Sequence, residues 1–156
     1  MKTLITAAIL AALSTAATAQ EIYGGAALDY GLAHGGDSQT VAALLAGAAW
    51  EGGRNITYGG EVDYGVSLFG DDDYDTLRLR GFAGYDIGGL EGRLALGLTS
   101  FSQDAGGSLG GYNFGLGLLR EVTPAVTARA ELIRDIVDEP GLSAVTTTRI
   151  GVTYGF

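Results

Sequence analysis

Residues 146–156 alternate in polarity without a break. On an extended strand, one face would carry Thr146, Thr148, Ile150, Val152, Tyr154 and Phe156, and the other would carry Thr147, Arg149, Gly151, Thr153 and Gly155. Successive side chains of a β-strand point to opposite faces, so this segment is predicted to be a strand with one apolar and one polar face. Such a strand must separate two different environments.

The same period of two recurs along the chain and predicts eight strands, separated by breaks rich in Gly and Asp. The predicted strands are residues 22–33, 40–50, 55–69, 76–87, 93–102, 112–121, 125–137 and 146–156. Each is long enough to supply the ~9–11 residues that a tilted strand needs to cross a bilayer. The pattern is weakest in 40–50, because residues 41–46 are apolar on both faces. A helix is the alternative for that segment.

The N-terminus has the pattern of a secretory signal peptide. Lys2 supplies a positive charge, residues 4–13 are an uncharged apolar run, and Ala17-Thr18-Ala19 has the form of a cleavage site. Residues 1–19 are therefore expected to be removed, which leaves residues 20–156 as one domain. No stretch approaches the roughly 20 apolar residues of a membrane helix, so a membrane-bound form would have to cross as strands.

Composition excludes some functions and helps to orient the strands. The chain has 9 basic and 18 acidic residues, which makes nucleic acid an unsuitable partner. There is no cysteine, so no disulfide framework holds the fold. A soluble barrel would also alternate, but its exterior would carry mixed charges including lysine. The polar faces here carry glycine between isolated charges instead, which suits a crowded lumen.

The charged residues on the polar faces are expected to form a network in the lumen. The predicted set is Asp29, Glu61, Asp63, Asp86, Glu131 and Asp135 with Arg78, Arg80, Arg93, Arg129 and Arg149. Arginine suits this role because its planar fork can hold several carboxylates and stays charged. The alternative is that these are solvated charges on the surface of a soluble sandwich.

Connections and aromatic residues fit a membrane barrel as well. If the mature N-terminus starts in the periplasm, residues 51–54, 88–92 and 122–124 become tight periplasmic turns, and residues 34–39, 70–75, 103–111 and 138–145 face outward. Two aromatic belts are expected at the membrane interfaces. One would contain Tyr23, Trp50, Tyr58, Tyr85, Tyr154 and Phe156, and the other Tyr30, Tyr64, Phe69, Phe101, Tyr112 and Phe114.

The chain resembles the small eight-stranded outer-membrane barrels, which include the transmembrane domain of outer membrane protein A and the opacity-type surface proteins. The resemblance rests on the architecture, the signal peptide and the ending at 146–156. It implies an all-β, eight-stranded antiparallel up-and-down transmembrane β-barrel in the Gram-negative outer membrane. Tyr154 and Phe156 resemble the C-terminal signal read by the outer-membrane assembly machinery. That machinery, outer-membrane lipid and lipopolysaccharide are the partners implied.

A structural or surface-interaction role is expected, because eight strands enclose an interior only just filled by side chains. A narrow pore and a lipid A-modifying enzyme are the alternatives. Two eight-stranded families that modify lipid A rely on His and Ser at the barrel rim or outer surface. Here His34, Asp37 and Ser38 share one loop and could form an acyl-transfer site. Neither family's motif is matched, so no catalytic residue is assigned.

No metal site or cofactor is predicted. Asp71, Asp73 and Asp75 have the spacing of the first ligands of an EF-hand loop, but Thr76 and Phe82 stand where glycine and glutamate are needed. The acidic outer loops are expected to bind divalent cations only loosely. The glycine-rich segment 106–111 does not lie between a strand and a helix, so it offers no context for a nucleotide.

Overall fold

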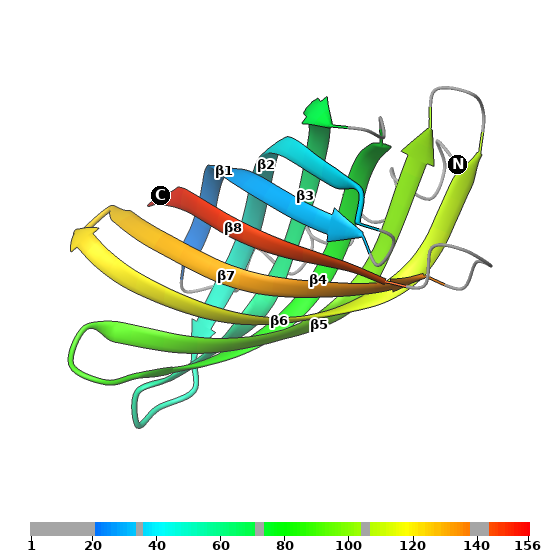
Figure 1. Cartoon of the computed structure of the whole chain (residues 1–156). Coiled ribbons are helices and arrows are strands. Elements are labelled where there is room, and N and C mark those ends of the chain that lie inside the picture. Colours follow the sequence, from blue (N-terminus) through cyan, green and yellow to red (C-terminus); the bar gives the residue numbers. More distant parts are fainter. Residues whose placement is uncertain (1–20, 34–35, 71–73, 104–106, 138–143) are drawn as a thin grey trace.

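The protein is a closed barrel of eight antiparallel strands, each paired with its neighbours in the sequence (Figure 1). The computed structural model describes residues 21–33, 36–70, 74–103, 107–137 and 144–156, so the predicted signal peptide lies outside the described residues. The strands are β1 (Glu21–Ala33), β2 (Ser38–Glu51), β3 (Ile56–Gly70), β4 (Tyr74–Asp86), β5 (Leu90–Gln103), β6 (Ser108–Thr123), β7 (Val126–Val137) and β8 (Ala144–Gly155). Pairing of β1 with β8 closes the sheet and confirms the expected fold class.

None of the described residues belongs to a helix that is long and apolar enough to cross a bilayer. The segment for which a helix was the alternative is β2, and the helical interpretation is wrong. Val41, Ala43 and Leu45 are buried inside the barrel, whereas Leu44 is 70% exposed on the outside. Both faces are apolar because β2 separates the exterior from an apolar part of the lumen. That part is formed by Tyr23, Ala27, Ala43, Leu45, Ala49, Phe82 and Ala95.

Several connections are shorter than the sequence pattern predicts. Residues 108–111 were expected in a loop but belong to β6, where Ser108 pairs with Ser102 and Gly111 with Thr99 of β5. A glycine-rich run becomes a strand here because the neighbouring strand supplies hydrogen-bond partners, which outweighs its low intrinsic propensity. The predicted turns at 88–92 and 122–124 shorten in the same way, since Leu90 begins β5 and Thr123 ends β6.

We call the end of the barrel with the β2–β3, β4–β5 and β6–β7 connections the turn end, and the opposite end the loop end. The β4–β5 turn has only two central residues, Gly88 and Gly89, with φ of 67° and 85°. The Ile87 amide donates to the Leu90 carbonyl at 2.9 Å. Two successive positive φ angles define the type I′ hairpin, which matches the strand twist and favours glycine.

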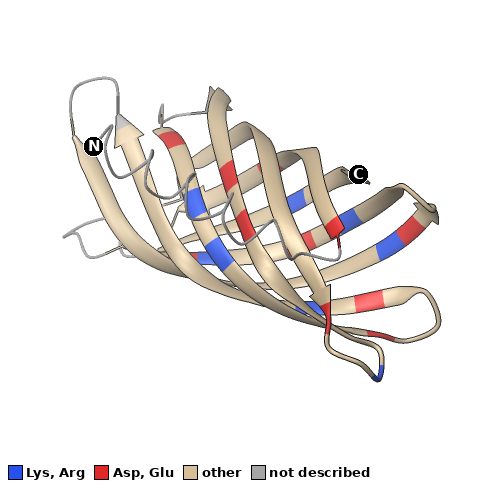
Figure 2. Ribbon diagram, turned by 180° about the vertical axis from the view of Figure 1, so that it is seen from behind, with Lys and Arg blue, Asp and Glu red and all other residues tan. Residues whose placement is uncertain are grey.

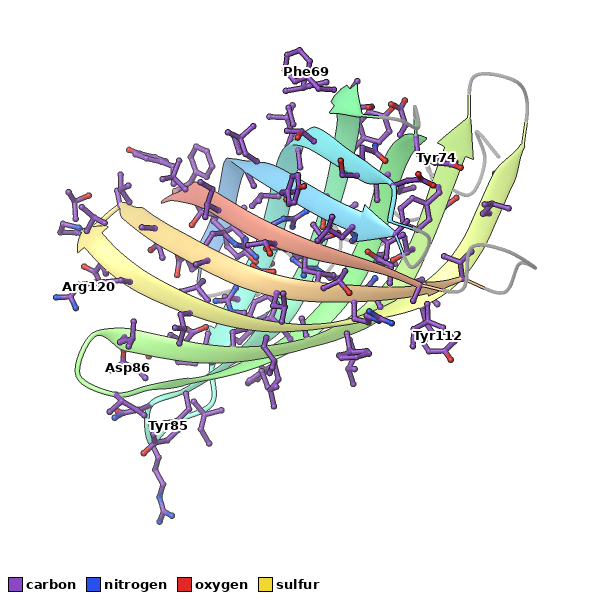
Figure 3. All side chains as sticks on the ribbon, in the orientation of Figure 1. Phe69, Tyr74, Tyr85, Asp86, Tyr112 and Arg120 are labelled. Atoms are coloured by element: carbon purple, nitrogen blue, oxygen red, sulfur yellow. The ribbon has the colours of Figure 1, made fainter. Side chains whose placement is uncertain are left out.

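The exterior is a band of apolar side chains. Leu94, Leu96 and Leu98 of β5 are 61–70% exposed, and Figure 3 shows Phe69, Tyr85 and Tyr112 pointing away from the barrel. Aromatic residues exposed on the outside are Tyr30, Tyr58, Tyr64, Phe69, Tyr85, Tyr112, Phe114, Tyr154 and Phe156. Soluble monomers rarely expose apolar surface on this scale.

Two members of the predicted aromatic belts do not belong there. Tyr23 and Phe101 are 6% and 5% exposed and lie in the lumen. Both occupy inward positions of the strand alternation. The Tyr23 hydroxyl donates to Glu61 Oε2 at 3.0 Å, and the Phe101 ring packs edge-on against Tyr74. The position of each residue in the strand alternation therefore decides whether its side chain points into the lumen or outward.

Candidate functional site

A cluster of charged side chains fills the middle of the lumen. Basic and acidic positions lie beside one another on neighbouring strands (Figure 2). The cluster brings together nine of the eleven residues predicted for the lumen, all at most 6% exposed: Asp29, Glu61, Asp63, Arg78, Arg80, Arg129, Glu131, Asp135 and Arg149. They come from β1, β3, β4, β7 and β8.

The part of the cluster nearer the loop end is held by two arginines that bridge several strands. Arg149 Nε donates to Asp29 Oδ1 at 2.7 Å, and its Nη2 donates to Asp63 Oδ1 at 2.8 Å. Arg78 Nη2 donates to Asp135 Oδ2 at 2.8 Å and its Nη1 to Asp29 Oδ2 at 3.1 Å. These contacts tie β8 to β3 and β4 to β7, pairs of strands that do not adjoin in the sheet.

The part nearer the turn end is built around two glutamates. Glu61 accepts from Arg80 Nη2 at 2.5 Å and from Arg129 Nη1 at 2.6 Å. Glu131 accepts from Arg80 Nη1 at 2.8 Å and also binds Arg129. Arg80 Nε lies 3.7 Å from Asp63 Oδ2, which connects this part to the other. Buried charges paired on several sides in this way satisfy the condition under which such charges are tolerated.

Arg93 and Asp86, the other two predicted lumen residues, stand apart from the cluster. Arg93 Nε donates to Glu91 Oε1 at 2.6 Å, and its guanidinium carbon lies 3.9 Å from the centre of the Phe82 ring. Asp86 lies at the turn end (Figure 3), where its carboxylate accepts from the Gly89 amide at 3.2 Å. Glu91 was missed by the sequence reasoning, although it precedes Arg93 by two residues and so shares its face of the strand.

The lumen is open at the turn end and filled by side chains further inside. At the turn end a cavity of about 200 Å³ is lined by Glu21, Glu51, Glu91 and Glu121, with Arg129 among its other lining residues. The cavity beside the cluster measures only about 10 Å³, which is at most the room of a single water. Toward the loop end the described residues leave a void of about 30 Å³ next to Phe101. Side chains therefore fill the barrel where the charges meet.

Comparison with known proteins identifies the architecture. No protein-family model matches the chain, and no curated protein matches it in sequence. Among solved structures, Neisserial surface protein A is similar with a TM-score of 0.59 and 15% identity, covering 87% of this chain and 96% of that one. The chain has the fold of the small eight-stranded outer-membrane barrels.

Other solved barrels agree with this assignment. Ail, the attachment invasion locus protein of Yersinia pestis, has a TM-score of 0.57 at 18% identity, over 87% of this chain and 97% of that one. The outer membrane enzyme PagL has a TM-score of 0.53 at 10% identity, over 83% and 98%. At these identities the likeness extends to the fold alone, and the matched barrels include both a surface protein and an enzyme.

Of the residues considered for acyl transfer and for metal binding, the structure describes Asp37, Ser38 and Asp75, which lie at the loop end. His34, Asp71 and Asp73 fall outside the described residues. Ser38 begins β2 and is half-buried, and Asp37 is exposed just before it. Within the part of the chain that the structure describes, no group of three His, Cys, Asp or Glu side chains is arranged to hold a metal ion.

Proposed function

We propose that the protein is an integral outer-membrane protein of a Gram-negative cell, exported by residues 1–19 and acting as a structural or surface-interaction barrel. The observation that carries this proposal is the division of the strands into an apolar exterior and a charged interior. In water such a protein would expose the surface that should be buried and bury charges at a cost. A bilayer around the barrel removes the first of these conflicts.

The filled lumen supports this role over that of a pore. Nine buried charged side chains bridge the walls of the barrel, and a solute would have to break several ion pairs to pass. Outer-membrane lipid, lipopolysaccharide and the assembly machinery are the partners we propose, together with loosely bound divalent cations at the acidic outer loops. Tyr154 and Phe156 are proposed as the signal that the machinery reads.

Fractionation combined with gel mobility tests location and barrel closure together. The wild-type protein is expected in the outer-membrane fraction, and it should migrate faster in an unheated sample than in a boiled one, because a closed barrel resists unfolding by detergent. Recovery in the soluble periplasmic fraction, or identical mobility with and without boiling, would contradict the proposal.

An enzyme acting on lipid A is the second candidate, because PagL shares the fold. Catalysis of this kind would require His34, the chain's only imidazole, as a base near neutral pH. We expect overexpression of the wild-type protein to leave the acyl pattern of lipid A unchanged in mass spectra, and His34→Ala to behave identically. A gain or loss of one acyl chain that disappears in His34→Ala would favour the enzyme over the structural role.

A further inference from the structure

We propose that Arg134 and an apolar groove beside it form a binding site for a phosphorylated acyl lipid on the outside of the barrel. The arginine would hold the phosphate, and the groove would hold an acyl chain. The inference rests on the proposed function, because it requires the exterior to face a bilayer.

The placement of arginine in this chain singles out Arg134. Of the eight arginines in the described residues, five point into the lumen, namely Arg78, Arg80, Arg93, Arg129 and Arg149. Arg54 lies in the β2–β3 connection, and Arg120 lies at the turn end of β6 (Figure 3). Arg134 lies on β7 close to the loop end, two residues before Ile136, which pairs with Tyr112. Among the described residues it is the only basic side chain on this part of the exterior.

Arg134 lacks a charged partner within the described structure. It pairs across the sheet with Phe114 and Thr146, and its Nη1 donates to Thr146 Oγ1 at 2.5 Å. The ion pairs formed among described residues all belong to lumen arginines. A cation on the lipid-facing surface is unfavourable near the midplane of the bilayer. The long aliphatic part of an arginine side chain lets its guanidinium reach the membrane interface instead. A phosphate there would accept two parallel hydrogen bonds from the guanidinium.

An apolar groove of about 570 Å³ crosses the outer surface of β5 to β8, and its lining includes Leu132 on the strand that carries Arg134. Its floor includes Ala130, whose cross-strand partners Leu118 and Ile150 are larger and form the walls. Leu132, one outward position before Arg134, also lines the groove, as does its partner Thr148. The groove therefore reaches Leu132, one outward position from Arg134 on the same strand. A positive charge at the interface end of an apolar groove is complementary to the phosphate and chain of a lipid such as lipid A.

Titration of the purified, detergent-solubilised barrel with diphosphorylated lipid A, followed by native mass spectrometry, tests the site. Arg134→Gln is expected to weaken lipid A binding about tenfold through loss of the charge-assisted hydrogen bonds. Ala130→Leu fills the groove and should weaken binding to a similar degree. Arg120→Gln removes an exterior arginine at the other end, and Ala26→Leu fills the β1 side of a second apolar groove of about 610 Å³ on β1, β2, β7 and β8. Both controls should bind like wild type.

Unchanged binding by Arg134→Gln, or equal weakening by Arg120→Gln, would overturn the proposal. Equally tight binding of inorganic phosphate alone and of lipid A would also overturn it, because the groove would then contribute nothing. Heat-dependent gel mobility of each variant reports whether its barrel is folded. If fractionation places the protein outside the outer membrane, the proposed function fails. If location and mobility hold while Arg134→Gln binds normally, only the lipid site fails.

Discussion

Replacing Arg149 with Met is expected to lower the free energy of unfolding of the barrel by about 3–5 kcal/mol. Arg149 is fully buried and bridges Asp29 and Asp63. Methionine retains much of the side-chain volume, so the main change is that two buried carboxylates lose a shared cation. Urea unfolding in lipid vesicles, followed by the fluorescence of Trp50, measures the difference.

Arg120→Met is the matched control for this variant. Arg120 is exposed at the turn end of β6, and substitutions at such surface positions usually change stability by less than about 0.5 kcal/mol. Combining Arg149→Met with Asp63→Asn should recover part of the loss, because one of the stranded charges is removed with its partner. Equal urea midpoints for Arg149→Met and Arg120→Met would show that the lumen cluster contributes no stability.

Replacing Phe156 with Asp is expected to remove most of the protein from the outer membrane while the signal peptide is still processed. Phe156 is 84% exposed, and its ring packs edge-on against Tyr154 with centroids 5.2 Å apart. Its amide donates to the Ile22 carbonyl at 2.9 Å, so the residue continues the hydrogen bonding between β8 and β1 that closes the barrel. A carboxylate in place of the ring removes the proposed assembly signal and puts a charge on the lipid face.

Immunoblots of fractionated cells, with and without boiling, measure the effect of this substitution. Phe156→Tyr keeps an aromatic ring and should assemble normally. Phe69→Asp introduces the same charge at another exposed aromatic, at the end of β3, and should reduce assembly far less. Normal outer-membrane levels of Phe156→Asp would refute the proposed role of the terminal aromatic.

The alternation of polarity predicted the strands because it reflects local geometry. Successive side chains of any extended segment point to opposite faces, so residues 146–156 could be assigned to two faces before any partner strand was known. The same rule places nine predicted charges in the lumen cluster. Phe101 fits the alternation, which puts it on the same face as Arg93, and not the expectation of an aromatic belt on the exterior.

Strand ends were harder to predict, because hydrogen-bond partners decide them. Residues 108–111 contain two glycines and a serine and have little tendency of their own to form a strand. They extend β6 because β5 continues opposite them. The same holds for β2, whose sequence also fits a helix, since β1 and β3 pair with it along its length and require it to be extended.

The sequence by itself determined which residues face the lumen and which face outward, and the balance of charge on each face. Only the tertiary structure decided which charges meet. Arg149 reaches Asp63 on β3 and Arg78 reaches Asp135 on β7, although neither pair lies on adjacent strands. Contacts across a barrel depend on how far the strands are staggered when the sheet closes. That stagger belongs to all eight strands together, so the pattern of a single strand does not contain it.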